Sequence, residues 1–329
     1  MFFLSLSVHE VVRCVVCGKE CAESLCSKCA VEKLNLALVD NIEVIECSSC
    51  GRYKKGGRWV SSNLNDVLKH EILKNIKIDE NFNLHSMEIF SREIVLYGSY
   101  GVEEVTYRVP FNFKIKKMSC ERCSRQSGGY YEAIVQIRTK DRRLDDEEVL
   151  KTVEILNAVL EAEGDNDFAF VSKIEEKKEG IDVFIGGRDV GRKISYKIAS
   201  EFGGKVFESK KLHTRIDGQN AYRFTYLVRI PSYKKGDVVL VKDRLAVVTN
   251  VKLGKGTDLI TGKTLDIKDA KVVVKKEELM KGIIVNFDEH AAEVMCESGL
   301  VVVEKPFRCK VGDEAKIFEF NGKYWAFVL

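Results

Sequence analysis

Residues 14–29 read CVVCGKECAESLCSKC, and this stretch decides how the first part of the chain folds. It belongs to a wider pattern in which eight of the eleven cysteines form four C-x2-C pairs: Cys14/Cys17, Cys26/Cys29, Cys47/Cys50 and Cys120/Cys123. A C-x2-C turn can direct two thiolates at one tetrahedral zinc ion, with Zn–S bonds of about 2.3 Å. Four such pairs in one section predict zinc sites rather than disulfides.

The order of the pairs predicts how they share two zinc ions. The first two pairs are close enough to form one compact four-thiolate site. Cys47/Cys50 should then share the second ion with Cys120/Cys123, which closes a loop of about seventy residues. A crossed arrangement is topologically less simple but is not excluded by the spacing. Cys21 could replace a ligand of the first site, although we expect a spare thiol near the metal.

Both sites are expected to be structural. A catalytic zinc keeps three protein ligands and an open position, whereas each of these sites would be filled by four cysteines. The sequence lacks H-E-x-x-H and the H-x-E with P-C-x-x-C pattern of zinc deaminases. The five histidines are scattered without ligand spacing, and Cys296 and Cys309 are expected to be small buried residues. We therefore predict no catalytic residue and no enzyme.

Composition limits the possible partners. The 329 residues carry a formal net charge of +3, and 45% of them are hydrophobic. A disordered chain and a strongly basic histone-like protein are excluded, so RNA binding needs local basic patches. No stretch reaches the roughly 18–20 apolar residues that span a bilayer. The first residues lack a basic n-region and a cleavage site, so we expect no signal peptide and a cytoplasmic protein.

The sequence pattern predicts a multidomain α+β protein with three sections. Residues 1–129 form the double zinc-binding domain, with a helix near Asn63–Ile76 and extended segments at Ser86–Tyr97 and Val102–Lys116 around a Gly98–Gly101 hairpin. Residues 130–232 form an α+β domain, and residues 233–329 form one or two small closed β-barrels. The middle section should contain helices at Asp145–Glu163 and Asp189–Phe202, and strands at Tyr131–Arg138, Phe168–Ile174, Ile181–Ile185, Lys205–Lys211 and Ala221–Ile230.

The helices of the middle section are expected to be amphipathic. The apolar stripe of the first should consist of Val149, Val153, Leu156 and Leu160, with Asp145 or Asp146 as its cap and Gly164 at its end. The stripe of the second should consist of Val190, Ile194, Ile198 and Phe202.

Three groups of cations are candidate RNA contacts, because Lys and Arg neutralise phosphates. The first follows the third cysteine pair, the second surrounds the fourth pair, and the third lies on the second helix of the middle section and the next strand. In that order they are Arg52, Lys54, Lys55 and Arg58; Lys116, Lys117, Arg122 and Arg125; and Arg188, Arg192, Lys193, Lys197, Lys210 and Lys211. The first and third groups could instead be ordinary solvated surfaces, and the second could instead stabilise the thiolate cluster, which carries a formal charge of −2 with zinc bound. Trp59 is expected to pack on the zinc core rather than to stack on bases.

The ordered motifs resemble one family. CVVCGKECAESLCSKC, followed by ECSSCGRYKKGGRWV, is similar to the start of the nonsense-mediated-decay protein three family, a large-ribosomal-subunit export adaptor. MSCERCSRQSGGYYEAIVQIR resembles the family's second zinc closure, and AYRFTYLVRIPSYKKGDVVLV resembles the start of its C-terminal domain. The resemblance implies a treble-clef-like zinc domain, a middle domain like a eukaryotic-type large-subunit ribosomal protein, and SH3-like or OB-like barrels like translation factor five-A.

The resemblance also implies a function. It predicts a ribosome-binding factor of late large-subunit biogenesis that binds rRNA on the intersubunit face and hinders subunit joining. The expected partners are rRNA and ribosomal proteins, with no membrane, no small-molecule substrate and a monomer off the ribosome. Eukaryotic members continue into a tail with transport signals, whereas this sequence stops at Leu329, which favours an archaeal-type member.

Two other classes remain open from the sequence. One is a zinc-containing RNA-modifying enzyme, and the other is a structural ribosome-associated protein. A separate, weaker match concerns Lys255, which lies between two glycines in the expected turn Lys252–Lys263. In translation factor five-A a glycine-flanked lysine at a barrel tip is functional, so a role for Lys255 stays open.

Overall fold

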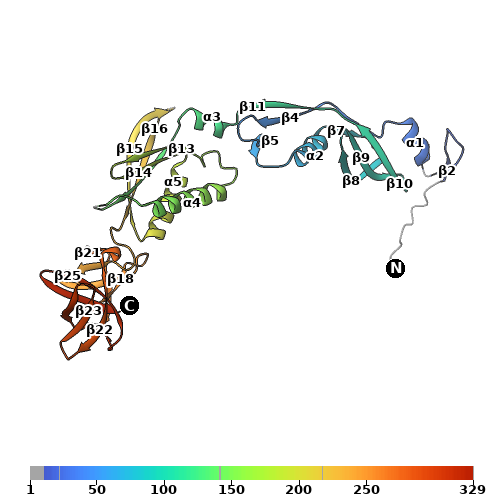
Figure 1. The fold of residues 1–329 in the computed structure, drawn as a ribbon. Coiled ribbons are helices and arrows are strands. Elements are labelled where there is room, and N and C mark those ends of the chain that lie inside the picture. Colours follow the sequence, from blue (N-terminus) through green and yellow to red (C-terminus); the bar gives the residue numbers. More distant parts are fainter. Residues whose placement is uncertain (1–10, 22, 141, 217, 329) are drawn as a thin grey trace, which may run out of the picture. The chain divides into compact units, whose positions relative to one another are not determined.

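The computed structural model describes residues 11–328 apart from residues 22, 141 and 217, and contains mostly β-strands (Figure 1). These described residues form five α-helices, none of which is long and apolar enough to cross a membrane. The segment for which we rejected a signal peptide, residues 1–10, lies outside them. The chain separates into two compact units, Met1–Ser124 and Arg125–Leu329. The domain boundaries at 129 and 232 stay predictions.

The N-terminal unit contains short strands near the cysteines and longer strands between the third and fourth pairs. Its elements are β1 (Val12–Arg13), β2 (Glu20–Cys21), α1 (Ser27–Lys33), β3 (Ala37–Val39), β4 (Ile42–Cys47), β5 (Tyr53–Lys55), β6 (Arg58–Val60), α2 (Leu64–Asn75), β7 (Ile76–Ile78), β8 (Phe82–Phe90), β9 (Glu93–Tyr100), β10 (Glu103–Pro110) and β11 (Phe113–Met118). Helix α3 (Glu121–Ser127) follows and leads into the second unit.

Helix α2 confirms the helix predicted near Asn63–Ile76. Asn63 caps it, because its side-chain oxygen accepts a hydrogen bond from the backbone N–H of Asp66 at 2.9 Å. The buried residues of the helix, Val67, Leu68 and Ile72, join one apolar core that also includes residues of β4, β9 and β10. Through this core, the long insert between the third and fourth cysteine pairs packs against β4, the strand that ends at Cys47.

The extended segments of this insert differ from the prediction in two places. Val102–Lys116 contains β10 and the start of β11, which belong to different sheets. Ser86–Tyr97 is not one strand, because β8 and β9 meet in a turn where Ser91 has a φ of +55°. The predicted hairpin is present, since β9 pairs antiparallel with β10, but Gly98 lies inside β9 rather than in the turn. A Cβ atom at Gly98 would lie 2.2 Å from the carbonyl oxygen of Asn83. This glycine therefore permits close strand packing.

The second unit begins with a five-stranded sheet in the order β13-β14-β12-β16-β15. Helices α4 and α5 lie on one side of it (Figure 1), where both contribute to a core with Ala133, Val135 and Ile137. The prediction of an α+β unit with this order of elements is confirmed, but the strand expected at Phe168–Ile174 begins and ends three residues later. The elements are β12 (Ala133–Thr139), α4 (Asp146–Ala162), β13 (Val171–Lys177), β14 (Gly180–Ile185), α5 (Arg188–Phe202), β15 (Lys205–Ile216) and β16 (Gln219–Ile230).

Helix α4 confirms the predicted stripe in part: Leu156 is buried, and Val149 and Leu160 are half-buried. Val153 is 43% exposed, and the buried positions include the polar residues Glu148 and Thr152. The hydroxyl of Thr152 donates to the carbonyl oxygen of Glu148, and Glu148 forms a capping box with Asp145. Hydrophobic spacing alone missed Glu148 and Thr152, because both polar side chains are satisfied inside the fold. The stripe of α5 is confirmed at Val190, Ile194 and Ile198, with Phe202 half-buried.

The last part of the chain contains two β-structures. The first is a five-stranded sheet, β20-β19-β18-β17-β21, and the second is a closed barrel, β22-β23-β24-β26-β25, which confirms that a small barrel is present. Their elements are β17 (Val238–Val241), β18 (Arg244–Asn250), β19 (Lys255–Asp258), β20 (Thr264–Asp266), β21 (Lys271–Val274), the 3-10 helix Lys276–Glu278, β22 (Met280–Phe287), β23 (Ala291–Cys296), β24 (Gly299–Glu304), β25 (Glu314–Phe320) and β26 (Lys323–Val328).

The expected turn at Lys252–Lys263 is wrong in part, because it contains strand β19. Lys255 is the first residue of that strand and lies opposite Asn250 and Asp266. Its Nζ atom is 3.6 Å from a carboxylate oxygen of Asp266. Lys255 is therefore not at a loop tip, since the tip precedes it at Val251–Gly254.

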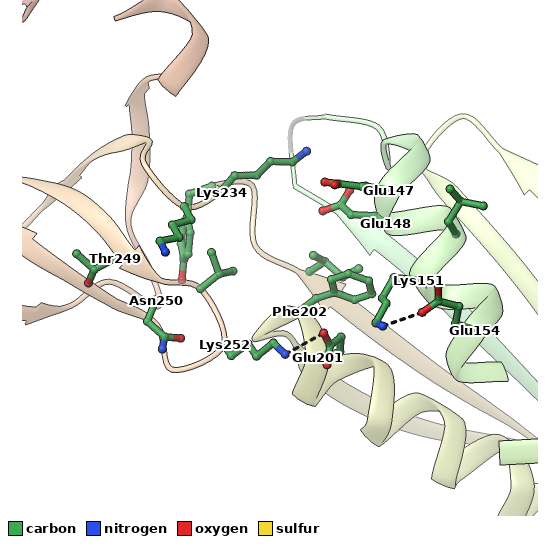
Figure 2. Close-up of a pocket in the computed structure, with 15 residues that line it drawn as sticks. Glu147, Glu148, Lys151, Glu154, Glu201, Phe202, Lys234, Thr249, Asn250 and Lys252 are labelled. Atoms are coloured by element: carbon green, nitrogen blue, oxygen red, sulfur yellow. Dashed lines mark hydrogen bonds and ion pairs between the residues drawn. The ribbon is translucent and has the colours of Figure 1, made fainter. Parts of the chain in front are cut away.

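The end of α5 contacts the loop after β18. Lys252 Nζ lies 2.8 Å from a carboxylate oxygen of Glu201, and the two flank a cavity of about 660 Å³ (Figure 2). Gly203, which ends α5 with a φ of +66°, packs so closely that a Cβ atom there would lie 2.1 Å from the carbonyl oxygen of Val251.

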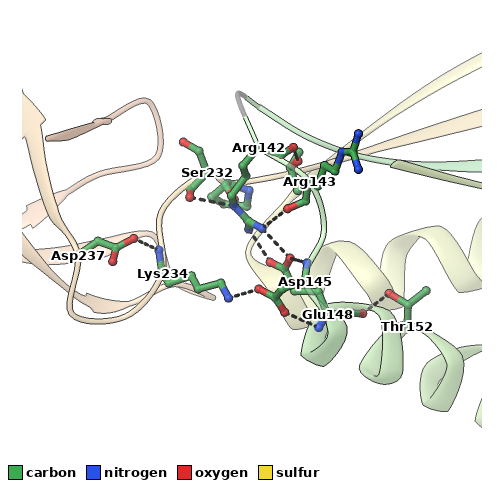
Figure 3. Close-up of polar contacts among 10 residues, drawn as sticks. Arg142, Arg143, Asp145, Glu148, Thr152, Ser232, Lys234 and Asp237 are labelled. Carbon is green, nitrogen blue, oxygen red and sulfur yellow. Dashed lines mark hydrogen bonds and ion pairs between the residues drawn. The ribbon is translucent and has the colours of Figure 1, made fainter. Parts of the chain in front are cut away.

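A second connection joins α4 to the segment after β16. The guanidinium of Arg142 donates to Glu148 and to the backbone carbonyl oxygens of Pro231 and Ser232 (Figure 3). Lys234 forms an ion pair with Asp145, the cap of α4. Burial lowers the pKa of Arg142, but Glu148 outweighs it and raises the pKa overall. The start of α4 is thus held to the segment after β16 by the partly exposed pair of Lys234 with Asp145 and by hydrogen bonds from the half-buried Arg142 to backbone carbonyl oxygens.

Candidate functional site

The first cysteine cluster lies between the β1–β2 hairpin and α1. Sulfur atoms of Cys14, Cys17, Cys26 and Cys29 all lie within 4.8 Å of one another. Cys26 is the residue immediately before α1, so the helix start presents Cys26 and Cys29 from one turn. Backbone hydrogen bonds from Cys14 N–H to Lys19 and from Gly18 N–H to Cys14 shape the opposing turn. The structure thus brings together the first set of four that the spacing predicts.

The second cluster joins two segments that are far apart in sequence. Strand β11 pairs parallel with β4, and their last partners are Met118 and Cys47. The turn after β4 carries Cys50, while Cys120 and Cys123 come from the start of α3. The sulfur atoms of these four cysteines again lie within 4.8 Å of one another. The crossed pairing is therefore not formed.

Both clusters fit zinc. The Sγ atoms of Cys17 and Cys26 are 3.6 Å apart, and those of Cys50 and Cys120 are 3.7 Å apart. A tetrahedral ion with Zn–S bonds of about 2.3 Å requires sulfur–sulfur distances of about 3.8 Å. A disulfide would need about 2.05 Å, and all eleven cysteines are free thiols. Two groups of four cysteines can therefore each hold one metal ion.

The backbone prepares one thiol in each cluster to ionise. Backbone N–H groups of Cys26 and Cys17 lower the pKa of Cys14 to about 6. Burial would raise the pKa of Cys47, but the N–H groups of Cys50 and Cys120 outweigh burial and lower it to about 6. Because the thiolate is the form that binds metal, these N–H groups favour metal binding at neutral pH.

Arg52 lies in a different place from the exposed position expected of an RNA contact. It is only 4% exposed, and its Nη2 atom donates to Cys120 Sγ at 3.1 Å. Trp59 is also 4% exposed and packs with Cys47 and Cys120, as we expected of a residue on the zinc core. Both side chains belong to the environment of the second cluster.

The other three cysteines lie outside these groups. Cys21 packs against the first cluster, but its thiol donates to the carbonyl oxygen of Glu23 at 3.0 Å, which fits a spare thiol. Cys309 is buried in the barrel core, as expected. Cys296 is only half-buried, and its sulfur contacts Ser298 and Gly299.

The cations near the second cluster have mixed surroundings. Lys116 and Lys117 pair with Glu43 and Glu46 across β11 and β4, at 3.8 and 2.6 Å. Among the described residues, no carboxylate lies within ion-pair distance of Lys54, Lys55, Arg58 or Arg122. Arg125, in the second unit, stacks over the ring of Phe168 at 4.4 Å. Only part of this group is therefore electrostatically available to a phosphate.

The basic face of α5 is largely neutralised. Arg188, Arg192 and Lys193 pair with Asp189, Glu208 and Glu163, at 3.1, 3.1 and 2.5 Å. Lys197 is exposed, as are Lys210 and Lys211 on β15, where Lys210 lies over the ring of Tyr222. These ion pairs weaken the expectation that α5 contacts RNA. RNA contact by the six cations on α5 and β15 stays a prediction.

The chain combines two four-cysteine clusters with α+β and all-β parts in two compact units. These features define its class, a multidomain protein with two four-cysteine metal sites. Residues 14–128 match the family model for the NMD3 N-terminal domain, and residues 130–230 match that for the NMD3 second domain. The two matches cover more than half of the chain, which therefore belongs to the NMD3 family, nonsense-mediated-decay protein three. This family consists of ribosome-associated biogenesis and export adaptors. No curated protein matches the chain in a direct sequence comparison.

Proposed function

We propose that this chain binds rRNA on the intersubunit face of the large ribosomal subunit late in assembly, and that it hinders joining of the small subunit. Membership of the NMD3 family, matched over residues 14–230, is the observation that carries the proposal. The chain would act in the cytoplasm as a monomer until it binds the subunit. Its partners would be rRNA and ribosomal proteins.

The metal ions would have a structural role in this function. When bound, zinc would hold the first cluster to α1 and the second cluster to the junction of β4, β11 and α3. Each cluster offers four thiolates to one tetrahedral ion, which supports a filled site and binding without catalysis. The ordered turns would present neighbouring cations such as Lys54, Lys55 and Arg58 at little entropic cost.

Several weak sites could combine into one firm attachment. The two units provide separate surfaces on one chain. Linked sites gain affinity by as much as roughly 10²–10⁴ over single sites when their geometry permits simultaneous binding. We therefore expect the full chain to bind the large subunit much more tightly than either unit alone.

The test is subunit association measured by light scattering. Purified archaeal large subunits are saturated with the chain, which gradient sedimentation verifies, and small subunits are then added. Reduced formation of joined particles supports the proposal. Joined particles that form equally well at demonstrated saturation would exclude occupation of the joining face.

A further inference from the structure

The five-stranded sheet β13-β14-β12-β16-β15 has one face without helices. Tyr226 and Val228 on β16 are buried against the core beneath α4 and α5. Because side chains alternate along a strand, Arg229 on β16 lies on the opposite face. Phe207 on β15 is on that same face, since its partner across the sheet is Leu227, and its side chain is 51% exposed. Of the residues on this face, only Lys211 is among the cations expected to contact RNA, although cations and apolar residues alternate in both strands.

This helix-free face carries more cations than carboxylates, although Arg138 pairs with Asp182, and Lys173 and Lys177 pair with Glu175. We define it by the outward residues of the five strands, up to the irregularity after Leu212 in β15. Its charged members are seven cations and two carboxylates: Arg138, Lys173, Lys177, Lys205, Lys211, Arg223 and Arg229, with Glu175 and Asp182. Residues 130–232 as a whole carry one more acid than base. Positive charge is thus concentrated on one side of a nearly neutral domain, which favours a polyanionic partner there.

Like charges also face each other directly on the β15–β16 pair. Lys205 lies opposite Arg229, and Lys211 lies opposite Arg223. Such pairs destabilise a sheet when nothing neutralises them. Lys205 is 3.1 Å from Asp269, whereas no carboxylate among the described residues lies within ion-pair distance of Arg229. A bound anion would relieve this repulsion.

A cavity of about 780 Å³ adjoins this face at the start of β15. Phe207, Lys205 and Arg229 are part of its lining. Lys140, Lys252 and Lys268 are three more cations in the lining, of which Lys252 pairs with Glu201 and Lys268 with Asp266. Asp269 is the one carboxylate among the lining residues that the structure describes. The cavity therefore extends the basic surface into a concave site next to an exposed aromatic ring.

We propose that the helix-free face and this cavity bind an unpaired RNA strand, with phosphates at Lys205 and Arg229 and a base stacked on Phe207. The Arg229 guanidinium already lies 5.7 Å from the centre of the Phe207 ring, an arrangement that suits a base and its phosphate together. An acidic peptide would use the cations but gain little from the exposed ring. This site deepens the proposed function and rests on it. It places the contact on β15, β16 and the end of α5 rather than on the basic residues Arg188, Arg192 and Lys193.

The experiment measures fluorescence anisotropy of a labelled 12-nucleotide oligouridine with the full zinc-loaded chain. Phe207→Ala should weaken binding about 5- to 150-fold, because base–aromatic stacking carries that much affinity. Combined K205Q and R229Q should reduce the slope of log affinity against log salt by about 1.4, or about 0.7 per phosphate. A matched RNA duplex should bind less tightly and respond little to F207A.

Two variants outside the site serve as controls. Phe90→Ala removes a similarly exposed ring, 54% exposed on β8, and K151Q removes a cation that pairs with Glu154 on α4. Both should bind the oligouridine like the wild type. The site is excluded if F207A and the double variant bind like the wild type, if the wild type does not bind oligouridine, or if a polyglutamate peptide competes at equal charge concentration. Subunit association with wild-type chain tests the proposed function separately, so the two failures can be distinguished.

Discussion

The guanidinium Nη2 atom of Arg52 lies 3.1 Å from the Sγ atom of Cys120, although 68 residues separate them in sequence. Arg52 is only 4% exposed, and its backbone carbonyl oxygen accepts a hydrogen bond from the N–H of Cys47. Four thiolates around one zinc ion leave a formal charge of −2 in this partly buried cluster. Arg52 therefore places a compensating charge next to the cluster.

Replacing Arg52 should weaken metal binding at the second cluster. We expect Arg52→Ala to lower zinc affinity there about 10- to 100-fold, the usual effect of losing a hydrogen-bond donor behind a metal ligand. Arg52→Lys should recover part of this loss because it keeps the charge. Competition with a chromophoric chelator measures the affinity, and the exposed Arg58→Ala provides the control. Unchanged affinity in R52A would show that the arginine only fills space.

The two clusters should hold one zinc ion each. Metal analysis of the purified chain should give two ions, and C26S or C120S should each reduce the content to one. Zinc contributes roughly 10–16 kcal/mol to small zinc modules, so C26S should unfold the first cluster while the barrel stays folded. Cys21→Ser should retain both ions, because Cys21 lies outside the two groups of four. Loss of an ion from C21S would make Cys21 a ligand.

The cysteine clusters could be predicted from sequence because C-x2-C spacing is a local property of each pair. Strand β11 pairs with β4 and so brings the fourth cysteine pair next to the third. The order of the four pairs along the sequence predicts this arrangement. The position of Arg52 could not be predicted, because a cation next to cysteines is equally compatible with RNA and with thiolates. Only the burial of its side chain distinguishes the two.

The middle section illustrates a second limit. The helices of this section follow from apolar spacing and caps, but the buried Glu148 depends on Arg142 and on backbone carbonyls of residues 231 and 232. Such pairing is invisible to hydrophobic periodicity. The acids that neutralise Arg192 and Lys193 come from β15 and the end of α4, which a helical projection of α5 cannot include.

Stability at the start of α4 should depend on pH through Asp145. Burial would raise the pKa of Asp145, but the ion pair with Lys234 and the N–H of Glu148 outweigh it and lower the pKa overall. A lowered folded pKa means stabilisation above the unfolded pKa of about 3.9, which is lost as pH falls through the folded value. Because both side chains are partly exposed, we expect at most about 1 kcal/mol.

Asp145→Asn tests this dependence, because asparagine keeps a neutral cap without the charge. At pH 7 the first turn of α4 should exchange its amide hydrogens faster in the variant than in the wild type. The difference should shrink as both proteins are compared at successively lower pH, and should vanish below the folded pKa. A difference that persists at the lowest pH would assign the effect to cap geometry rather than to charge.

Gly203 should control the packing of α5 against the loop after β18. Its φ is +66°, and an added Cβ atom would meet the carbonyl oxygen of Val251 at 2.1 Å. Gly129 has a similar φ of +68° but no atom within 4 Å of the added Cβ position, so it is a matched control. Gly129→Ala should cost about 1–2 kcal/mol from backbone strain alone. Gly203→Ala should cost about 1–3 kcal/mol more, because backbone must move to remove the overlap.

Hydrogen exchange locates the effect of Gly203→Ala. We expect faster exchange at the end of α5 and in residues 244–254, where Lys252 pairs with Glu201. The core strand β12 should keep its protection in both variants, because Ala133, Val135 and Ile137 belong to a core that includes no residue of 244–254. Equal exchange of residues 244–254 in G203A and G129A would mean that the close approach of Gly203 to Val251 does not hold α5 against the following sheet.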